Sequence, residues 1–198
     1  MKSDSRNPLA AYEVGYIGWT HVPGELADGI CYFERWDRVQ QIAVSHALVV
    51  TGTEYCMEAH WPRVASAPLS KYFNDPKTVI VFRRPRGWTP ELGRRIADAA
   101  ASQDGAEYDL PLIISQLAAH TLVGHYLNKW FHNKPDDYVS RWLDRKGQFI
   151  CSELAAFALN QQPEFRGKGI LSRPLDTINP QELFEDPVLF EAPIFRTR

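Results

Sequence analysis

The sequence contains only three cysteines, Cys31, Cys56 and Cys151. They are too few and too widely spaced for the disulfide framework of a small secreted domain. None of them forms the Cys-x-x-Cys pair that is typical of structural zinc sites. Because three is an odd number, at least one thiol has no disulfide partner within the chain. The cysteines therefore raise the question of thiol reactivity rather than of cross-linking.

An excess of charge of one sign is also lacking, since 22 Lys and Arg residues stand against 24 Asp and Glu residues, for a formal net charge of −2. This composition supplies no basic field for phosphate backbones, so we do not expect nucleic acid to be the main partner. No Gly-, Ser- or Pro-rich linker, internal repeat or low-complexity tract divides the 198 residues. With 44 % hydrophobic residues, the sequence predicts one domain over residues 1–198 with an ordinary core.

No hydrophobic run is long and apolar enough for a membrane span. The most apolar stretch, residues 111–131, is interrupted by Ser115, Gln116, His120, His125, Asn128 and Lys129. It is too polar to cross a bilayer and predicts a largely buried helix. The charged N-terminus is not followed by the apolar segment of a secretory signal peptide. We therefore expect a cytoplasmic protein, or one exported by a secretion system that needs no signal peptide.

The pattern of β-branched, apolar and turn-forming residues predicts strands that gather in the first half of the chain and in its tail. The predicted strands cover residues 12–19, 30–33, 41–50, 54–61, 77–83 and, as an edge strand, 187–195. Helices are predicted from Pro90 to just before Gly105, with Thr89 as N-cap, and over residues 111–131, 136–143 and 149–160. This order favours an α+β fold over alternating βαβ units.

Cys151 is the first candidate for chemistry, because the sequence places it in the first turn of the helix over residues 149–160. The unpaired N–H groups and the dipole of a helix start lower the pKa of a thiol, and the thiolate is the nucleophilic form. The alternative is that Cys151 packs as a small buried hydrophobic residue, as we expect for Cys31 and Cys56.

His46 is the candidate base. It interrupts an otherwise apolar strand, where an unpaired ring would lose hydration, so it either faces a cleft or has a specific partner. The alternative is a core histidine bonded to a backbone carbonyl. The other histidines are weaker candidates, because His120, His125 and His132 lack the i, i+4 spacing of a metal pair. The sequence therefore does not support a zinc site.

A third residue would orient the imidazole and stabilise its charged form. If the strands around Thr51-Gly52-Thr53 form an antiparallel hairpin with a three-residue loop, even-numbered residues share the face of His46. Glu58 and His60 then both qualify, whereas a two-residue loop would present Met57 and Ala59. We favour Glu58, since a carboxylate stabilises an imidazolium more strongly than a second imidazole does, and we keep His60 as the alternative.

Several segments together resemble a known family over residues 29–180. These segments are Ser45-His46-Ala47-Leu48-Val49, Met57-Glu58-Ala59, Ala106-Glu107-Tyr108-Asp109-Leu110, Phe149-Ile150-Cys151-Ser152-Glu153-Leu154 and Pro174-Leu175. In this order they resemble the circularly permuted branch of the NlpC-type papain-like cysteine peptidases, the YiiX/YaeF-like amidases. In that branch the histidine strand and its acidic partner precede the cysteine helix, and the sheet is antiparallel.

The resemblance implies a role for each matched residue. Cys151 would be the nucleophile, His46 the general base and acid, and Glu58 the orienting residue. Tyr108 matches the tyrosine of the family's Tyr-Asp element, where its hydroxyl would donate to the oxyanion or to the substrate. Asp109 is expected to cap the following helix. The sequence departs from the family in its first thirty residues and in the long helical region over residues 111–145.

The resemblance also implies an activity. We expect a thiol hydrolase that cleaves an amide of a peptide, a cell-wall muropeptide or a lipid, or a lipid ester, through a thioester acyl-enzyme. It would act as a monomer with no cofactor or metal, and the backbone N–H of Cys151 would serve the oxyanion. Two alternatives stay open: a lipid acyltransferase of the lecithin-retinol type, with residues 111–131 lining an acyl pocket, and a catalytically silent binding module.

Overall fold

The computed structural model describes residues 12–21, 42, 44–60, 62–76, 78–108, 148–149 and 151–195. Cys31, the predicted strand over residues 30–33 and the predicted helices over residues 111–131 and 136–143 lie outside the described residues. Within the described part of the chain, no helix is long and apolar enough to cross a membrane.

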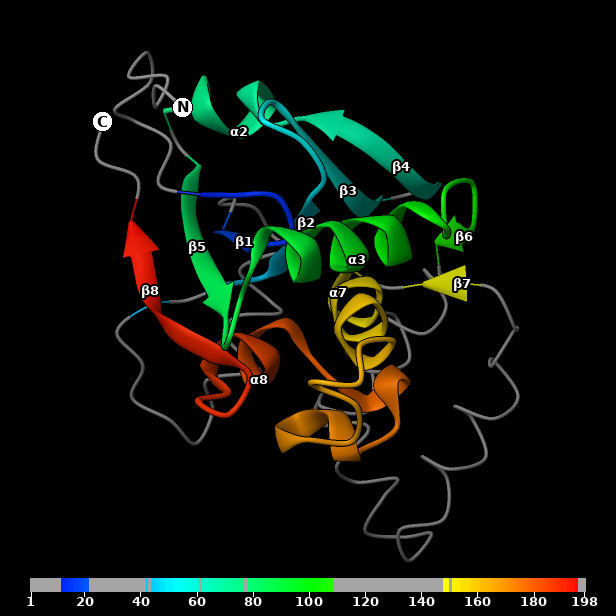
Figure 1. Ribbon diagram of the computed structural model, residues 1–198. Helices are drawn as coiled ribbons and strands as arrows, with labels where there is room; N and C mark the ends of the chain where they lie inside the picture. Colours follow the sequence, from blue (N-terminus) through cyan, green and yellow to red (C-terminus); the bar gives the residue numbers. More distant parts are fainter. Residues whose placement is uncertain are drawn as a thin grey trace, which may run out of the picture.

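The described strands form one sheet in the order β7-β6-β4-β3-β2-β1-β5-β8 (Figure 1). The strands are β1 (Ile17–His21), β2 (His46–Val50), β3 (Tyr55–His60), β4 (Arg63–Pro68), β5 (Val79–Pro85), β6 (Glu107–Tyr108), β7 (Gln148–Phe149) and β8 (Phe190–Phe195). All neighbouring pairs are antiparallel except β6 and β7, which are parallel. With its helices packed on this sheet, the protein has the predicted α+β class.

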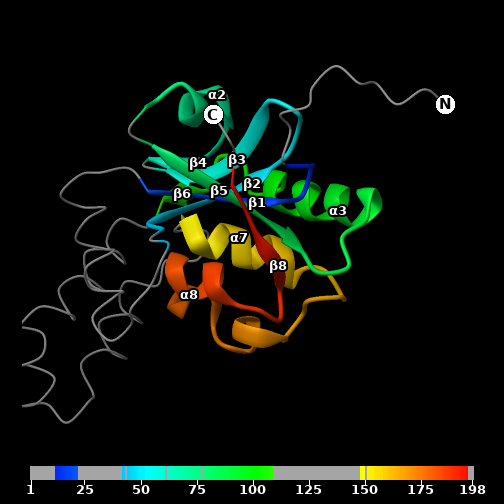
Figure 2. The same cartoon turned by 90° about the vertical axis from the view of Figure 1, so that its left-hand side faces the viewer.

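Helices cover both faces of the sheet. They are α2 (Ser70–Phe73), α3 (Pro90–Ala101), α7 (Cys151–Asn160) and α8 (Pro180–Glu185), with the 3₁₀ turns η1 (Gly169–Ser172) and η2 (Leu175–Thr177). Figure 2 shows α2 on one side of the sheet and α7 and α8 on the other. Because strand side chains alternate between faces, Ala47 and Val49 pack in the core with α3, α7 and α8, whereas Leu48 and Val50 pack in the core with α2.

The helix starts follow the chemistry of their caps. Thr89 accepts a hydrogen bond from the N–H of Leu92 at 3.1 Å and Pro90 occupies the first turn, as predicted for α3. The helix α7 begins at Cys151, two residues later than predicted, because Phe149 pairs with Tyr108 as part of β7. The helix α8 was not predicted, although its Asn-Pro start carries the same type of signal.

The N-terminal strand is shorter than predicted. Residues 12–16 form a turn in which Gly15 has a φ of +83°, and β1 begins only at Ile17. The aromatic residues of this turn pack against the sheet rather than extend it, since Tyr16 is buried and the half-buried Tyr12 ring stacks on Phe82 with centroids 4.6 Å apart. Near the other end of the chain, β8 is the edge strand that the sequence predicts, and Pro193 is tolerated there.

A close approach between the Gly15 turn and α3 gives a testable prediction. A Cβ at Gly93 would collide with the carbonyl oxygen of Val14 and lie 2.6 Å from Nε1 of Trp88. Gly93→Ala should therefore lower the free energy of unfolding by about 2 kcal/mol, although alanine is the better helix former. The measurement is urea denaturation beside Asp98→Ala, a substitution at an exposed position of the same helix. A stabilised Gly93→Ala protein would contradict this packing.

Candidate active site

The hairpin of β2 and β3 places Glu58 beside His46. Leu48 pairs with Glu58 and Val50 with Cys56, and the N–H of Thr51 donates to the carbonyl of Tyr55 at 3.0 Å, which leaves a three-residue loop. Even-numbered residues of the two strands therefore share one face. Nε2 of His46 lies 2.9 Å from Oε2 of Glu58, so the two side chains are hydrogen-bonded.

The other residues considered for the third position lie elsewhere. The His60 ring stands edge-on to the His46 ring with centroids 6.4 Å apart, at the exposed end of β3. Met57 and Ala59 point to the opposite face, into the core that contains α7. The carboxylate of Glu58, rather than the His60 ring, is thus hydrogen-bonded to Nε2 of His46. Nδ1 is the ring nitrogen that remains available to a thiol.

Cys151 is the first residue of α7 and is buried, with 6 % of its surface exposed. Its Sγ lies 4.0 Å from the carbonyl oxygen of Ser45, the residue before His46. The thiol therefore sits at the start of β2, where the helix and the histidine strand meet. The next residue fixes this helix start, because the hydroxyl of Ser152 donates to the carbonyl of Ile178 at 2.7 Å.

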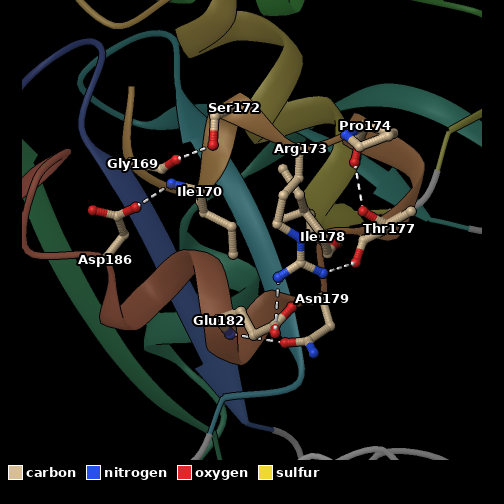
Figure 3. A network of polar contacts seen from close by, with 11 residues as sticks. Gly169, Ile170, Ser172, Arg173, Pro174, Thr177, Ile178, Asn179, Glu182 and Asp186 are labelled. Atoms are coloured by element: carbon tan, nitrogen blue, oxygen red, sulfur yellow. Dashed lines mark hydrogen bonds and ion pairs between the residues drawn. The ribbon is translucent and has the colours of Figure 1, made fainter. Parts of the chain in front are cut away.

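The Ile178 carbonyl belongs to a segment braced by polar contacts (Figure 3). The Asp186 carboxylate accepts from the N–H of Ile170 at 2.6 Å, and Arg173 binds Glu182 at 3.1 Å and the carbonyl of Thr177 at 3.2 Å. These bonds tie η1 and η2 to α8 on either side of Ile178. The network acts on the candidate site indirectly, through the hydrogen bond to Ser152.

Burial and hydrogen bonding set the protonation of Cys151 and His46 as a pair. Burial alone raises the pKa of the thiol, but the hydrogen bond and charge of His46, with the backbone N–H groups of Ala47 and Ser152, hold it below its ordinary value. Burial alone lowers the pKa of His46, but bonds to Cys151 and Glu58 raise it to about 9. Both shifts favour a thiolate beside an imidazolium at neutral pH.

Glu58 has two further partners, which sequence reasoning missed. Lys71 Nζ lies 2.8 Å from Oε1 of Glu58, and the hydroxyl of Tyr72 donates to Oε2. Although burial raises the pKa of the carboxyl, His46, Lys71 and Tyr72 together lower it to about 2. Both residues belong to α2, which follows β4, and no motif in the sequence links them to Glu58. The only available signal was general, namely that a buried carboxylate needs donors.

The other sequence candidates have less defined places. Tyr108 lies in β6, whose pairing with Phe149 brings its backbone next to the strand that precedes Cys151. The Tyr108 side chain and Asp109 lie outside the described residues. Cys56 is buried on the α2 face, and burial raises the pKa of its thiol to about 12. This thiol is protonated at neutral pH, which agrees with the expected packing role.

Comparison with protein-family models found no match, and comparison with curated proteins found none either. Among solved structures, the crystal structure of the metalloprotein YiiX from Escherichia coli O157:H7 matches with a TM-score of 0.56. The match covers 93 % of this chain and 97 % of that chain at 17 % sequence identity. The fold is similar to that of YiiX. At this identity the likeness concerns the fold alone.

YiiX is a metalloprotein, which raises the question of whether this chain also has donor groups for a metal ion. Among the residues that the structure describes, no group of three or more His, Cys, Asp and Glu side chains is arranged to hold a metal ion. His46 and Glu58 are bonded to each other rather than directed at a common point.

The acidity of Glu58 predicts a pH-dependent contribution to stability. Because its pKa is lower in the fold than in the unfolded chain, the ionised carboxylate stabilises the protein fully above about pH 5, and this contribution is lost as the pH falls toward 2. Glu58→Gln should lower the free energy of unfolding by roughly 3 kcal/mol at neutral pH and by much less near about pH 3. Denaturation curves at both pH values test this, and equal losses at both would contradict it.

Proposed function

We propose that this protein is a cysteine hydrolase that cleaves an amide or ester by acyl transfer. Cys151 is the nucleophile, His46 the general base and acid, and Glu58 the residue that orients His46. The observation that carries the proposal is the 2.9 Å bond between Nε2 of His46 and Oε2 of Glu58, on an imidazole that also interacts with Cys151. A thiol at a helix start, next to an imidazole that is hydrogen-bonded to a buried carboxylate, is the arrangement that a thiol hydrolase needs for its nucleophile, its base and its orienting residue.

The mechanism follows from the protonation of the pair. The Cys151 thiolate attacks the substrate carbonyl carbon, and the new C–S bond displaces its π electrons onto the oxygen. The backbone N–H of Cys151 at the start of α7 is a donor for this oxyanion. The His46 imidazolium gives its proton to the leaving amine or alcohol as the tetrahedral intermediate collapses to a thioester. Neutral His46 then takes a proton from water, whose oxygen attacks the thioester and releases the carboxylic acid and Cys151.

The substrate class rests on the family resemblance in the sequence. The resemblance to the YiiX/YaeF-like amidases implies that the substrate is a peptide, a muropeptide, or a lipid amide or ester. Residues 111–131, on which the acyltransferase alternative depends, lie outside the described residues, so no described contact favours it over hydrolysis. A binding module would not need a thiol activated by His46, and the experiments below separate it from an enzyme.

The first test is the pH dependence of cysteine alkylation by iodoacetamide, followed for each cysteine by peptide mass spectrometry. We expect Cys151 to react below pH 7, because its pKa is lowered, and this reactivity to be lost in His46→Ala. Cys56, whose pKa is raised to about 12, is the internal control and should remain unlabelled. An ordinary thiol profile for Cys151 that His46→Ala leaves unchanged would remove the hydrolase proposal and favour a binding module.

The second test is turnover. A panel of peptide, muropeptide and lipid amides and esters should contain a substrate whose cleavage falls about a thousandfold or more in Cys151→Ala. Rapid acid quenching should trap an acyl group on Cys151, visible as a mass increase on its peptide. Products are analysed with and without an added amine or alcohol acceptor. Release of the free acid supports hydrolysis, whereas exclusive transfer to the acceptor would overturn it in favour of an acyltransferase.

A further inference from the structure

The helix α2 contributes two side chains to Glu58 from the face of the sheet opposite α7. Lys71 and Tyr72 are adjacent in a four-residue helix that has no side-chain cap of its own. The Tyr72 ring is buried in the cluster that contains Leu48, Cys56 and Phe82, whereas the Lys71 side chain is 45 % exposed. This short helix is therefore held by its packing against the sheet, and its position brings two donors to one carboxylate.

The two carboxylate oxygens have different partners. Oε2 accepts from both His46 and Tyr72, and Oε1 accepts from Lys71. With both oxygens held, the carboxylate cannot turn about its Cγ–Cδ bond without losing a hydrogen bond to a charged group. The contacts from α2 therefore fix the orientation of the oxygen that faces His46.

The charge of Lys71 has a role that Tyr72 cannot fill. When His46 is an imidazolium, it balances the charge of Glu58. When His46 has given up its proton, Glu58 would be an isolated buried anion without a second cation, and burial of an unpaired charge is costly. Lys71 supplies that cation in both states of His46.

The ionisable surroundings of Glu58 come from four elements. His46 faces it from β2, and Lys71 and Tyr72 face it from α2. Cys56 lies two residues away on β3 itself, and Cys151 of α7 lies beyond His46. On the β4 side the residue paired with Glu58 is the uncharged Ala65.

We propose that Lys71 and Tyr72 are positioning residues that hold the Glu58 carboxylate in register with His46 through both steps of acyl transfer. This role rests on the proposed hydrolase function. It assigns to α2 the task of keeping Glu58, the third residue of the proposed site, aligned with His46. Neither residue touches the thiol or the substrate in this role. Their effect on Cys151 passes through Glu58 and His46.

The experiment compares Tyr72→Phe and Lys71→Met with wild type by the rate of Cys151 alkylation at about pH 6. Tyr72→Phe should slow the reaction about tenfold, because a carboxylate that can turn away from His46 stabilises the imidazolium less and the thiolate fraction falls. Lys71→Met should slow it less, because losing the Lys71 charge by itself favours the protonated form of His46, which partly offsets the loss of orientation. Lys71→Arg, which keeps the charge, should retain most of the rate. Tyr72→Phe removes only a hydroxyl, so it tests the proposal even if Lys71→Met does not fold.

Matched controls and a double-mutant cycle separate positioning from general packing. Tyr16→Phe removes a hydroxyl from the same buried cluster, on a ring that packs against Trp88, and Lys168→Met removes an exposed lysine. Both should leave the rate unchanged. In a Glu58→Gln background, Tyr72→Phe and Lys71→Met should have no further effect on the rate, since the residue through which they act is gone.

The outcomes distinguish the two proposals. If wild-type Cys151 reacts as an ordinary thiol, the hydrolase function fails whatever the variants do. If wild-type Cys151 is activated but Tyr72→Phe and Lys71→Met only lower the melting temperature, the positioning role alone is overturned. Rate losses that add to that of Glu58→Gln would likewise overturn it, because they would show an effect that does not pass through Glu58.

Discussion

The hydrogen bond between the buried Glu58 carboxylate and His46 is the constraint on which the candidate site depends. A carboxylate with 4 % of its surface exposed requires donors on both oxygens, and the fold supplies them from two layers. One donor comes from the neighbouring strand β2 and two come from α2. Moving either layer would leave a charge unpaired in the protein interior, so alignment of the site and stability of the fold are linked.

The sheet also connects this carboxylate to a thiol on its other side. Strand β2 is buried on both faces, and His46 at its start is the point where the α2 layer and the α7 layer meet. The resemblance to YiiX in overall fold agrees with this arrangement of a sheet between helices. The chemistry proposed for the site rests on its own side chains, because a likeness at 17 % identity extends only to the fold.

Local signals in the sequence were sufficient for much of the fold. The hairpin of β2 and β3, the Thr89 cap of α3 and the edge strand β8 follow from alternation, capping and proline placement, which act over a few residues. The prediction was less accurate where tertiary packing decides. Residues 12–16, with Tyr12 and Tyr16, were expected in a strand, but they form a turn in which the Tyr12 ring packs on Phe82 of β5 and the Tyr16 ring on Trp88, just before α3. The strand β4 and the helices α2 and α8 were not predicted.

The same division holds for the candidate site. The sequence by itself determined the residue types, their order, the place of Cys151 in the first turn of a helix and, if the hairpin loop has three residues, the face that Glu58 shares with His46. Only the tertiary structure decided that Glu58 rather than His60 is hydrogen-bonded to Nε2 of His46. It also decided that Lys71 and Tyr72 are the further hydrogen-bond partners of the Glu58 carboxylate. These choices depend on how α2 folds back across the sheet. Such contacts join residues that no local periodicity relates, because their geometry is set by the packing of whole layers.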